Sequence, residues 1–312
     1  MNLITLANRY ITERRQLGYK LISEARCILD FAGYFQEIEG GHALTTELTL
    51  EWASLAPSGS SIAIARRFGI LRPFSQYLHQ HGFTHLVLPT HYLGPTHRRL
   101  PPYIYSAAEI KRLMTAASNL IRIDGLRPHT IRALIGLLIS TGIRPGEAVR
   151  LQCNEVDLHE NVLTISNSKG WYQRIVPIST SRASELGKYR LRRIEANPIN
   201  STGAFFEFNN QQPLNIRSAD HAFKILREVT GITNKLNGRL PRLYDLRHTF
   251  VCQRVLAWYK NDVDINTKVT QLSRYLGHKK VSDTYWYITA IPELMTIAAD
   301  KFAKYSNEGG AS

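Results

Sequence analysis

The sequence predicts a mainly α-helical protein with one small β-sheet, which is an α+β fold in two domains. Apolar residues recur at helical spacing over most of the 312 residues. Only two short stretches, Val162–Ile165 and Tyr172–Ile178, have the residue types of strands. A proline-rich segment at residues 89–103 has no periodic apolar face, so it separates a shorter helical part from a longer one.

The first predicted domain, residues 1–88, consists of helices. A second long periodic run within it covers residues 60–81, and Pro73 is expected to kink or break the helix there. Arg66 and Arg67 lie beside apolar residues in this run, so one face can be buried while another contacts phosphate. The first run at helical spacing contains Ile28, Phe31, Ala32 and Phe35.

Residues 89–103 are predicted to be a linker with positive charge. The segment contains several prolines, which disfavour helix, and Arg98 and Arg99 follow one another within it. A second, larger domain is expected at residues 104–305, and residues 306–312 are expected to form a loose tail.

The larger domain begins with recognisable helix signals. Residues 106–109, Ser-Ala-Ala-Glu, match a capping box and predict that a helix starts at Ser106. Residues 128–141 are apolar almost all round and predict a buried central helix, which Gly142 ends. Pro145 suits the first turn of another short helix.

The two predicted strands are joined through Ser168, Lys169 and Gly170, so they form a hairpin with Lys169 at its tip. Helices then dominate to Tyr305. The last one, residues 293–305, places its apolar residues on one face, which predicts packing on its own domain.

The composition favours a nucleic-acid partner. The formal charge is +14, and a positive field of this size attracts polyanions, of which nucleic acid is the commonest. A basic ribosome-associated or membrane-surface protein would carry a similar charge. The three cysteines are odd in number and far apart, which indicates reduced thiols and not a disulfide framework or zinc site. No apolar run is long enough to span a membrane, so we expect a cytoplasmic, nucleoid-associated protein.

Two segments contain the residues that chemistry needs. Residues 241–250 include Arg247, and residues 271–289 include His278 and, nine positions later, Tyr287. Neither segment has metal-ligand spacing or a glycine-rich phosphate loop. Attack of a tyrosine hydroxyl on phosphorus, among fixed cations, is one of the few reactions that such residues can perform.

The charges of that reaction can be assigned to particular side chains. Arg144 and Arg247 are candidates for holding phosphoryl oxygens, because a guanidinium makes two parallel charged hydrogen bonds and keeps its proton. Lys169 could protonate a departing 5′-oxygen, and His278 could bind a phosphoryl oxygen or move a proton. Each residue also has an ordinary interpretation, such as a turn lysine or a histidine at a helix C-terminus.

Taken in order, Arg144, Lys169, Arg247, His278 and Tyr287 resemble the catalytic set of the tyrosine recombinase, or phage-integrase, family. The motifs that carry the resemblance are TGIRPGE, the SKG hairpin, DLRHTF, YLGH and the tyrosine nine positions after that histidine.

The resemblance implies a mechanism that needs no metal and no cofactor. Tyr287 would attack the scissile phosphate to form a 3′-phosphotyrosyl bond and release a 5′-hydroxyl. Arg144 and Arg247 would hold the phosphoryl oxygens, Lys169 would be the general acid, and His278 would assist.

The resemblance also implies how the protein would engage DNA. Residues 1–88 would be a core-binding domain that clamps double-stranded DNA together with the catalytic domain, and Arg98 and Arg99 would cross the backbone. Residues 293–305 would dock on a neighbouring protomer in a tetramer that acts on two duplexes at a specific site. A partner recombinase or a DNA-bending protein could also be required.

One residue departs from the family pattern. The position three residues before the second arginine usually holds histidine, and here it is Tyr244. A phenol can still donate a hydrogen bond to a phosphoryl oxygen, but it is a poor general base near neutral pH. We therefore expect Tyr244 to tune the rate without abolishing it.

Several biological roles fit this family. The TYWYITAIPELM segment favours an integrase of a transposon or other mobile element, while the chain length also suits a Xer-like dimer resolvase. A catalytically idle DNA-binding accessory and a type IB topoisomerase-like nickase would share the fold or the chemistry. A helical regulator whose motifs match by coincidence is the most remote role.

Overall fold

The computed structural model describes most of the chain, and it divides into two compact units, residues 1–100 and 101–312. The described residues are 2–38, 44–90, 92–96, 101–120, 125–166, 173–199, 202–208, 211–233, 240–261, 263–278 and 280–289. The division falls inside the segment that we predicted as a linker. Among the described residues, no helix combines the length and apolar character needed to cross a membrane.

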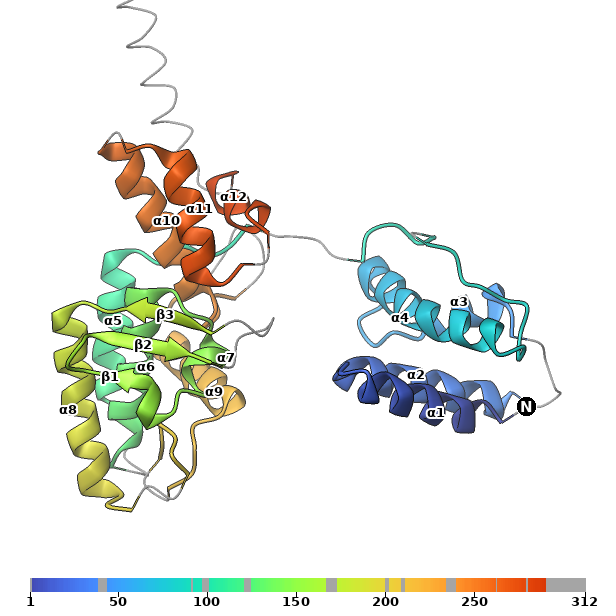
Figure 1. The fold of residues 1–312 in the computed structure, drawn as a ribbon, viewed down its shortest axis with the longest axis horizontal. Helices are drawn as coiled ribbons and strands as arrows, with labels where there is room; N and C mark the ends of the chain where they lie inside the picture. The colour runs from blue at the N-terminus through green and yellow to red at the C-terminus, as the bar shows by residue number, and fades with distance from the viewer. Residues whose placement is uncertain are drawn as a thin grey trace, which may run out of the picture. The chain divides into compact units, whose positions relative to one another are not determined.

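The described part of the first unit is helical, as Figure 1 shows. Three of its helices begin at a side chain that accepts a backbone N–H, namely Asn2, Thr45 and Ser60, which satisfies donors that a helix N-terminus leaves free. Its core includes the fully buried side chains of Phe31 and Trp52. The helices are α1 (Leu3–Gln16), α2 (Ile22–Glu37), α3 (Thr46–Ser54) and α4 (Ser61–Gln80).

Helix α4 runs through Pro73 without interruption, so the predicted break there is wrong. A proline inside a helix removes one backbone hydrogen bond and costs about 3 kcal/mol or more. Leu71, Phe74 and Leu78 on either side of it are at most 1% exposed, so burial of this face offsets the local cost.

The second unit contains helices and one small sheet. Its elements are α5 (Ala107–Ser118), α6 (Arg127–Thr141), α7 (Pro145–Ala148), the 3₁₀ helix η1 (Cys153–Glu155), β1 (Val156–Asp157), β2 (Val162–Ile165), β3 (Arg174–Pro177), α8 (Thr180–Ala196), α9 (Ile216–Val229), α10 (Asp245–Lys260), α11 (Ile265–Leu276) and α12 (Ser282–Thr289).

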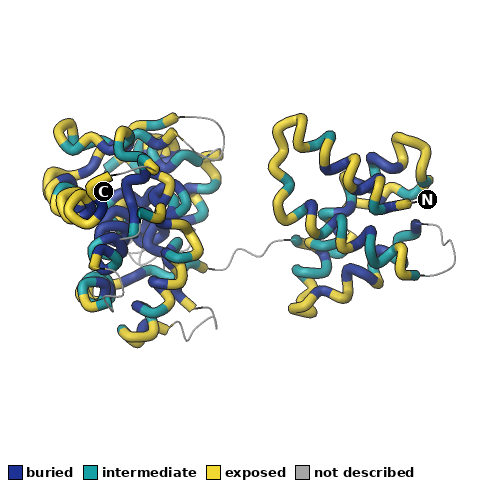
Figure 2. Tube along the Cα trace, turned by 90° about the horizontal axis from the view of Figure 1, so that it is seen from below, coloured by how far each residue is buried: buried dark blue, intermediate teal, exposed yellow. Residues whose placement is uncertain are grey.

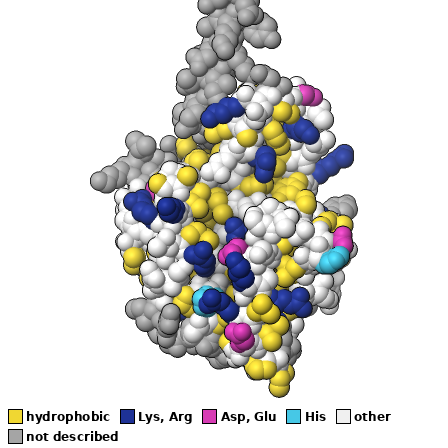
Figure 3. Space-filling view, turned by 90° about the vertical axis from the view of Figure 1, so that its left-hand side faces the viewer, with side chains coloured by type: hydrophobic (Ala, Val, Ile, Leu, Met, Phe, Trp, Pro, Cys, Tyr) yellow, Lys and Arg dark blue, Asp and Glu magenta, His cyan; other side chains and the backbone are white. Residues whose placement is uncertain are grey.

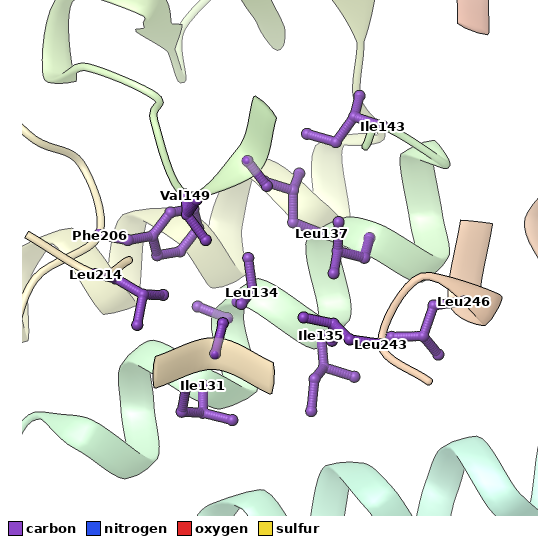
Figure 4. Close-up of a cluster of buried hydrophobic side chains, with 14 of the residues drawn as sticks. Ile131, Leu134, Ile135, Leu137, Ile143, Val149, Phe206, Leu214, Leu243 and Leu246 are labelled. Carbon is purple, nitrogen blue, oxygen red and sulfur yellow. The ribbon is translucent and has the colours of Figure 1, made fainter. Parts of the chain in front are cut away.

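Helix α6 is the centre of this unit, as its apolar sequence predicted. Helices α5, α8 and α10 all pack against it, and Figure 2 shows the buried segments that result. Figure 4 shows the apolar side chains of α6 among residues from later loops and helices. The cluster includes Ile131, Leu134, Ile135, Leu137, Val149, Phe206, Leu214, Leu243 and Leu246. The predicted capping box at Ser106 and the end of α6 at Gly142 are both present.

The sheet has three antiparallel strands in the order β1-β2-β3. Leu163 in the central strand pairs with Val156 on one side and Val176 on the other, and all three side chains are buried. The two predicted strands are therefore present, and the two-residue strand β1 was missed because it is too short to show a period. The predicted hairpin tip with Lys169, helix 293–305 and tail 306–312 lie outside the described residues.

A second apolar cluster in this unit joins the last helices. Helices α10, α11 and α12 contact one another through Phe250, Val251, Leu272, Leu276 and Tyr287. Because Tyr287 belongs to this cluster, the position of α12 depends on the packing of α10 and α11.

A substitution at Gly142 would test how closely the end of α6 packs against α10. Its φ is +63°, and a Cβ atom there would lie 2.3 Å from Cδ1 of Phe250. We expect Gly142→Ala to lower the free energy of unfolding by about 2–4 kcal/mol, from backbone strain and overpacking together. Denaturant titration would measure the loss.

Gly231→Ala is the matched control, because φ is +64° there and nothing lies within 4 Å of the added carbon. Strain alone should lower its stability by about 1 kcal/mol. Equal losses in the two variants would mean that the contact with Phe250 is unimportant.

Candidate active site

Arg247 lies in the first turn of α10 and is fully buried. Its two terminal nitrogens donate to the carbonyl oxygens of Gly142, at 2.8 Å, and Leu276, at 2.9 Å. Gly142 caps the C-terminus of α6 and Leu276 is the last residue of α11, so both carbonyls carry the partial negative charge of a helix end. Burial lowers the pKa of Arg247, although a guanidinium remains charged in proteins.

Arg144 lies at the N-cap of α7 and approaches the same helix end. One of its terminal nitrogens donates to the carbonyl oxygen of Gly277 at 2.8 Å, one residue beyond the carbonyl that Arg247 contacts. The other donates to Oε1 of Glu147 at 2.8 Å. The two arginines predicted to hold phosphate are therefore brought together, from segments about a hundred residues apart in the sequence.

Glu147 is a carboxylate that we did not predict, and it holds two arginines. Its side chain is 2% exposed and accepts from Arg144 and, at 2.6 Å, from Arg174 of β3. Burial raises the pKa of Glu147, but the hydrogen bonds and charges of Arg174 and Arg144 outweigh it and lower the pKa overall. Nε of Arg174 also donates to the carbonyl of Tyr275, which ties β3 to α11.

His278 follows Gly277, which ends α11 with a φ of +67°. Its Nε2 lies 2.8 Å from a terminal nitrogen of Arg247, and its Nδ1 lies 2.7 Å from Oγ1 of Thr284. Because arginine can only donate, Nε2 accepts and the ring is neutral, with its proton on Nδ1. Burial and the charges of Arg247 and Arg144 lower the pKa of His278 to about 4, in agreement with a neutral ring.

Tyr287 lies beside these groups and is 4% exposed. Its ring is parallel to that of His278, with an interplanar angle of 2° and a centroid distance of 6.1 Å. Burial raises the pKa of Tyr287 to about 12, and the nearby Arg247 opposes this rise. Tyr285 differs: it is 41% exposed, and its hydroxyl donates to Asn266 at 3.4 Å. The structure therefore places Tyr287, and not Tyr285, at the cluster of cations.

Tyr244 is at the N-cap of α10, three residues before Arg247. Its ring contacts His248 edge to face at a centroid distance of 5.1 Å, and His248 in turn lies 5.2 Å from the ring of Tyr287. His248 is 7% exposed, and burial lowers its pKa to about 4. It belongs to the DLRHTF motif, but the motif alone gave it no role of its own.

The remaining predicted residues are less central. Arg66 is exposed on α4, whereas Arg67 forms an ion pair with Asp30 at 2.7 Å and lies 4.0 Å from the ring of Trp52. Arg67 therefore packs within its own unit. Lys169, Arg98 and Arg99 lie outside the described residues, and their roles stay predictions.

The unpredicted residues differ in how they could have been found. Glu147 follows Arg144 by three positions and accepts from its backbone N–H at 3.1 Å, as the acidic residue of a capping box does. Arg174 and Thr284 carry no local signal, because their partners Glu147 and His278 are recognised only after folding. Within the described part of the chain, no group of His, Cys, Asp and Glu is arranged to hold a metal ion.

Comparisons with known proteins place the chain in a family. The sequence profile of the phage integrase family matches residues 105–293. The chain is 34% identical over 291 residues to the putative integrase/recombinase y4rB of Sinorhizobium fredii, and the match covers 92% of each protein. It is 27% identical to the tyrosine recombinase XerC of Chlamydia caviae, over 72% of this chain and 66% of XerC.

Solved structures share the fold. A lambda integrase tetramer bound to a Holliday junction matches with a TM-score of 0.64 and 15% identity, over 92% of this chain and 77% of that one. At this identity the match supports the helical fold with its small sheet, as the sequence predicted.

The buried histidines should make stability depend on pH. The pKa of His248 is about 4 in the folded protein and 6.5 ordinarily, so the unfolded chain binds a proton first as pH falls. The contribution of neutral His248 to the free energy of unfolding should be fully present above pH 6.5. It should be lost towards pH 4, which lowers the free energy of unfolding by up to about 3 kcal/mol from His248 alone. Denaturant titration across this range measures it.

His248→Gln should give a shallower decrease, and His159→Gln, whose side chain is 93% exposed, should behave as wild type. An unchanged slope in His248→Gln would show that His248 does not titrate in this way.

The profile match covers more than half of the chain, and a relative more than 30% identical covers nearly all of it. The arginines, histidine and tyrosine that the motifs singled out lie together at the end of α11. The chain belongs to the phage integrase family and is a tyrosine-type site-specific DNA recombinase.

Proposed function

We propose that Tyr287 is the nucleophile of this recombinase and that Arg144, Arg247 and His278 bind the scissile phosphate. One observation carries the proposal: Arg144 and Arg247 donate to the consecutive carbonyls of Gly277 and Leu276, and His278 and Tyr287 lie beside them. A phosphodiester placed there would meet two guanidinium groups and the tyrosine together.

The charges at this position suit a phosphate. Arg144, Arg174 and Arg247 are positive, Glu147 is negative and His278 is neutral, which leaves two positive charges. Arg247 is held by carbonyl oxygens, which orient it without neutralising it. Such preorganised cations stabilise the charge that develops on non-bridging oxygens during phosphoryl transfer.

The reaction is balanced without an external energy source. The hydroxyl oxygen of Tyr287 forms a bond to phosphorus, the bond from phosphorus to the 5′-oxygen breaks, and the departing oxygen takes a proton, which we assign to Lys169. Attack by a 5′-hydroxyl then reverses these steps and rejoins the strand. Because one phosphodiester bond is exchanged for another, the bond energy is retained.

In the free protein Tyr287 is protonated near neutral pH, because its pKa is about 12. A nucleophile in this state needs a proton acceptor or a further lowering of its pKa when DNA binds. His278 is neutral and its ring lies parallel to that of Tyr287. Its Nε2 accepts from Arg247, so in our proposal His278 takes up the tyrosine proton only after Arg247 turns from Nε2 to the phosphate. Tyr244 is in our proposal a phosphate contact that tunes the rate.

We further propose that the enzyme integrates or excises a mobile element. The relative at 34% identity over 92% of the chain is named an integrase/recombinase, whereas the XerC relative is 27% identical over 72%. A Xer-like dimer resolvase is the second candidate, and a catalytically idle accessory is the third. Double-stranded DNA at a specific site and assembly as a tetramer on two duplexes fit the tetramer bound to a Holliday junction.

Tyr287→Phe should retain DNA binding and lose covalent attachment, since only the nucleophilic oxygen is removed. The protein would be mixed with the DNA that flanks its native gene, denatured quickly and examined for protein–DNA adducts. Tyr285→Phe, two positions away on the same helix, is the matched control and should still form adducts.

Adducts in Tyr287→Phe would assign the nucleophile elsewhere. Specific binding without adducts in wild type would favour the accessory role.

Arg144→Gln should slow cleavage at saturating DNA by roughly 10²–10³, the effect of losing one transition-state donor. Arg217→Gln removes an exposed arginine from α9 and serves as the control. Single-turnover adduct formation measures both rates. A rate within a few-fold of wild type would exclude Arg144 from the site.

A further inference from the structure

A second cluster of positive charge lies in a pocket between α5, α6 and α8. The pocket has a volume of about 380 Å³. In Figure 1, α8 lies at one edge of its unit, and α7 and α12, which carry active-site residues, lie towards the other. Figure 3 faces the α8 side and shows Lys and Arg side chains gathered near histidine and acidic side chains. The charged and histidine residues that line the pocket are His129, Arg132, Arg182, Glu185, Lys188 and Arg192.

The lining carries a net positive charge. It contains four cations and, among the described residues, one carboxylate, so three positive charges remain when His129 is neutral. The carboxylate of Glu185 is already paired with Lys188 at 2.8 Å. The hydrogen bond from Lys188 and the charges of Lys188, Arg132 and Arg182 lower the pKa of Glu185. The positive charge of the pocket's described lining residues therefore exceeds their negative charge.

The guanidinium of Arg182 has a buried nitrogen that no described residue satisfies. Its Nε is buried and has no hydrogen-bond partner within the described residues. Burial is the main cause that lowers its pKa, and the neighbouring Arg132 lowers it further. A buried donor without a partner costs about 1–3 kcal/mol, and more when it is charged. An anion that supplies acceptor oxygens would remove this penalty.

The backbone of α6 makes room for this guanidinium. A Cβ atom at Gly136 would lie 2.2 Å from a terminal nitrogen of Arg182. The glycine therefore lets the guanidinium lie against the helix backbone, at a position where any side chain would displace it. Such a fit holds the planar fork in one orientation.

Neighbouring arginines are also fixed in place. Arg132 donates to Oγ of Ser118 at 2.8 Å and to the carbonyl of Met114 at 3.3 Å, both in α5. Arg192 contacts the ring of His129 at 2.6 Å. Guanidinium groups from α6 and α8 thus surround one small space, and α5 supplies acceptors for one of them.

We propose that this pocket binds a phosphate-bearing anion, with Arg182 and Arg192 donating to its oxygens. Guanidinium forks match phosphate geometry, and the volume is large enough to admit two phosphoryl groups. The phosphate could come from a free polyphosphate or from the backbone of a DNA segment other than the one being cleaved. Both sources present the same oxygens to the pocket.

The test uses the full-length protein with inorganic pyrophosphate, followed by isothermal titration calorimetry. Wild type should bind pyrophosphate, and Arg182→Gln/Arg192→Gln should raise the Kd at least about tenfold, as expected for lost charged hydrogen bonds. Arg192→Gln alone, which changes an exposed side chain, should raise it several-fold and guards against misfolding of the double variant. Arg190→Gln, an exposed arginine of α8 outside the pocket, should bind as wild type.

Any binding at Arg144 and Arg247 is common to all these proteins, so the difference between them reports the pocket. Affinity for a short duplex of unrelated sequence, measured against salt, distinguishes the two sources. A salt slope that falls by about 1 for each lost contact assigns the pocket to DNA, and a change for pyrophosphate alone assigns it to a free polyphosphate. Equal pyrophosphate binding in wild type and both pocket variants, or none in wild type, overturns the proposal.

Discussion

The geometry of the candidate active site depends on the buried guanidinium of Arg247. It starts from the first turn of α10 and reaches the ends of α6 and α11, so one side chain fixes three helix termini. Its partners are carbonyl oxygens of Gly142 and Leu276 and the ring of His278. The helix-end carbonyls offset the loss of water around the cation, but they carry no full charge. The positive charge of Arg247 is therefore oriented and not neutralised.

Glu147, in contrast, brings a full negative charge to the cluster of arginines. Arg144 and Arg174 approach each other from α7 and β3, and the carboxylate between them reduces their mutual repulsion. Since one negative charge serves two cations, the cluster remains positive. The same carboxylate ties the sheet to α7, while Nε of Arg174 ties it to α11. Residues that would contact DNA and residues that hold the fold together are thus parts of one hydrogen-bonded network, in which a change to one partner affects the others.

This sequence departs from the family pattern at Tyr244, and the structure shows which residues surround that position. Tyr244 packs against His248, which packs against Tyr287, so an aromatic chain connects the departure to the proposed nucleophile. The ring of His278 lies parallel to that of Tyr287 and is neutral because Arg247 donates to it. The free protein consequently holds a protonated tyrosine beside neutral rings and fixed cations. In our proposal, DNA binding completes the site by supplying the phosphate to which these cations respond.

Local signals in the sequence determined many of the helices and strands of this protein. The capping box at Ser106, the all-round apolar helix that ends at Gly142, and the strands around Leu163 were readable because each depends on nearby residues. The motifs also singled out Arg144, Arg247, His278 and Tyr287, which the fold brings together. Only the tertiary structure decided that α4 continues through Pro73, that Glu147 and Arg174 pair, and that Tyr287 is buried while Tyr285 is exposed. These outcomes depend on contacts between segments that are distant in the chain, where burial and charge compensation outweigh local preference.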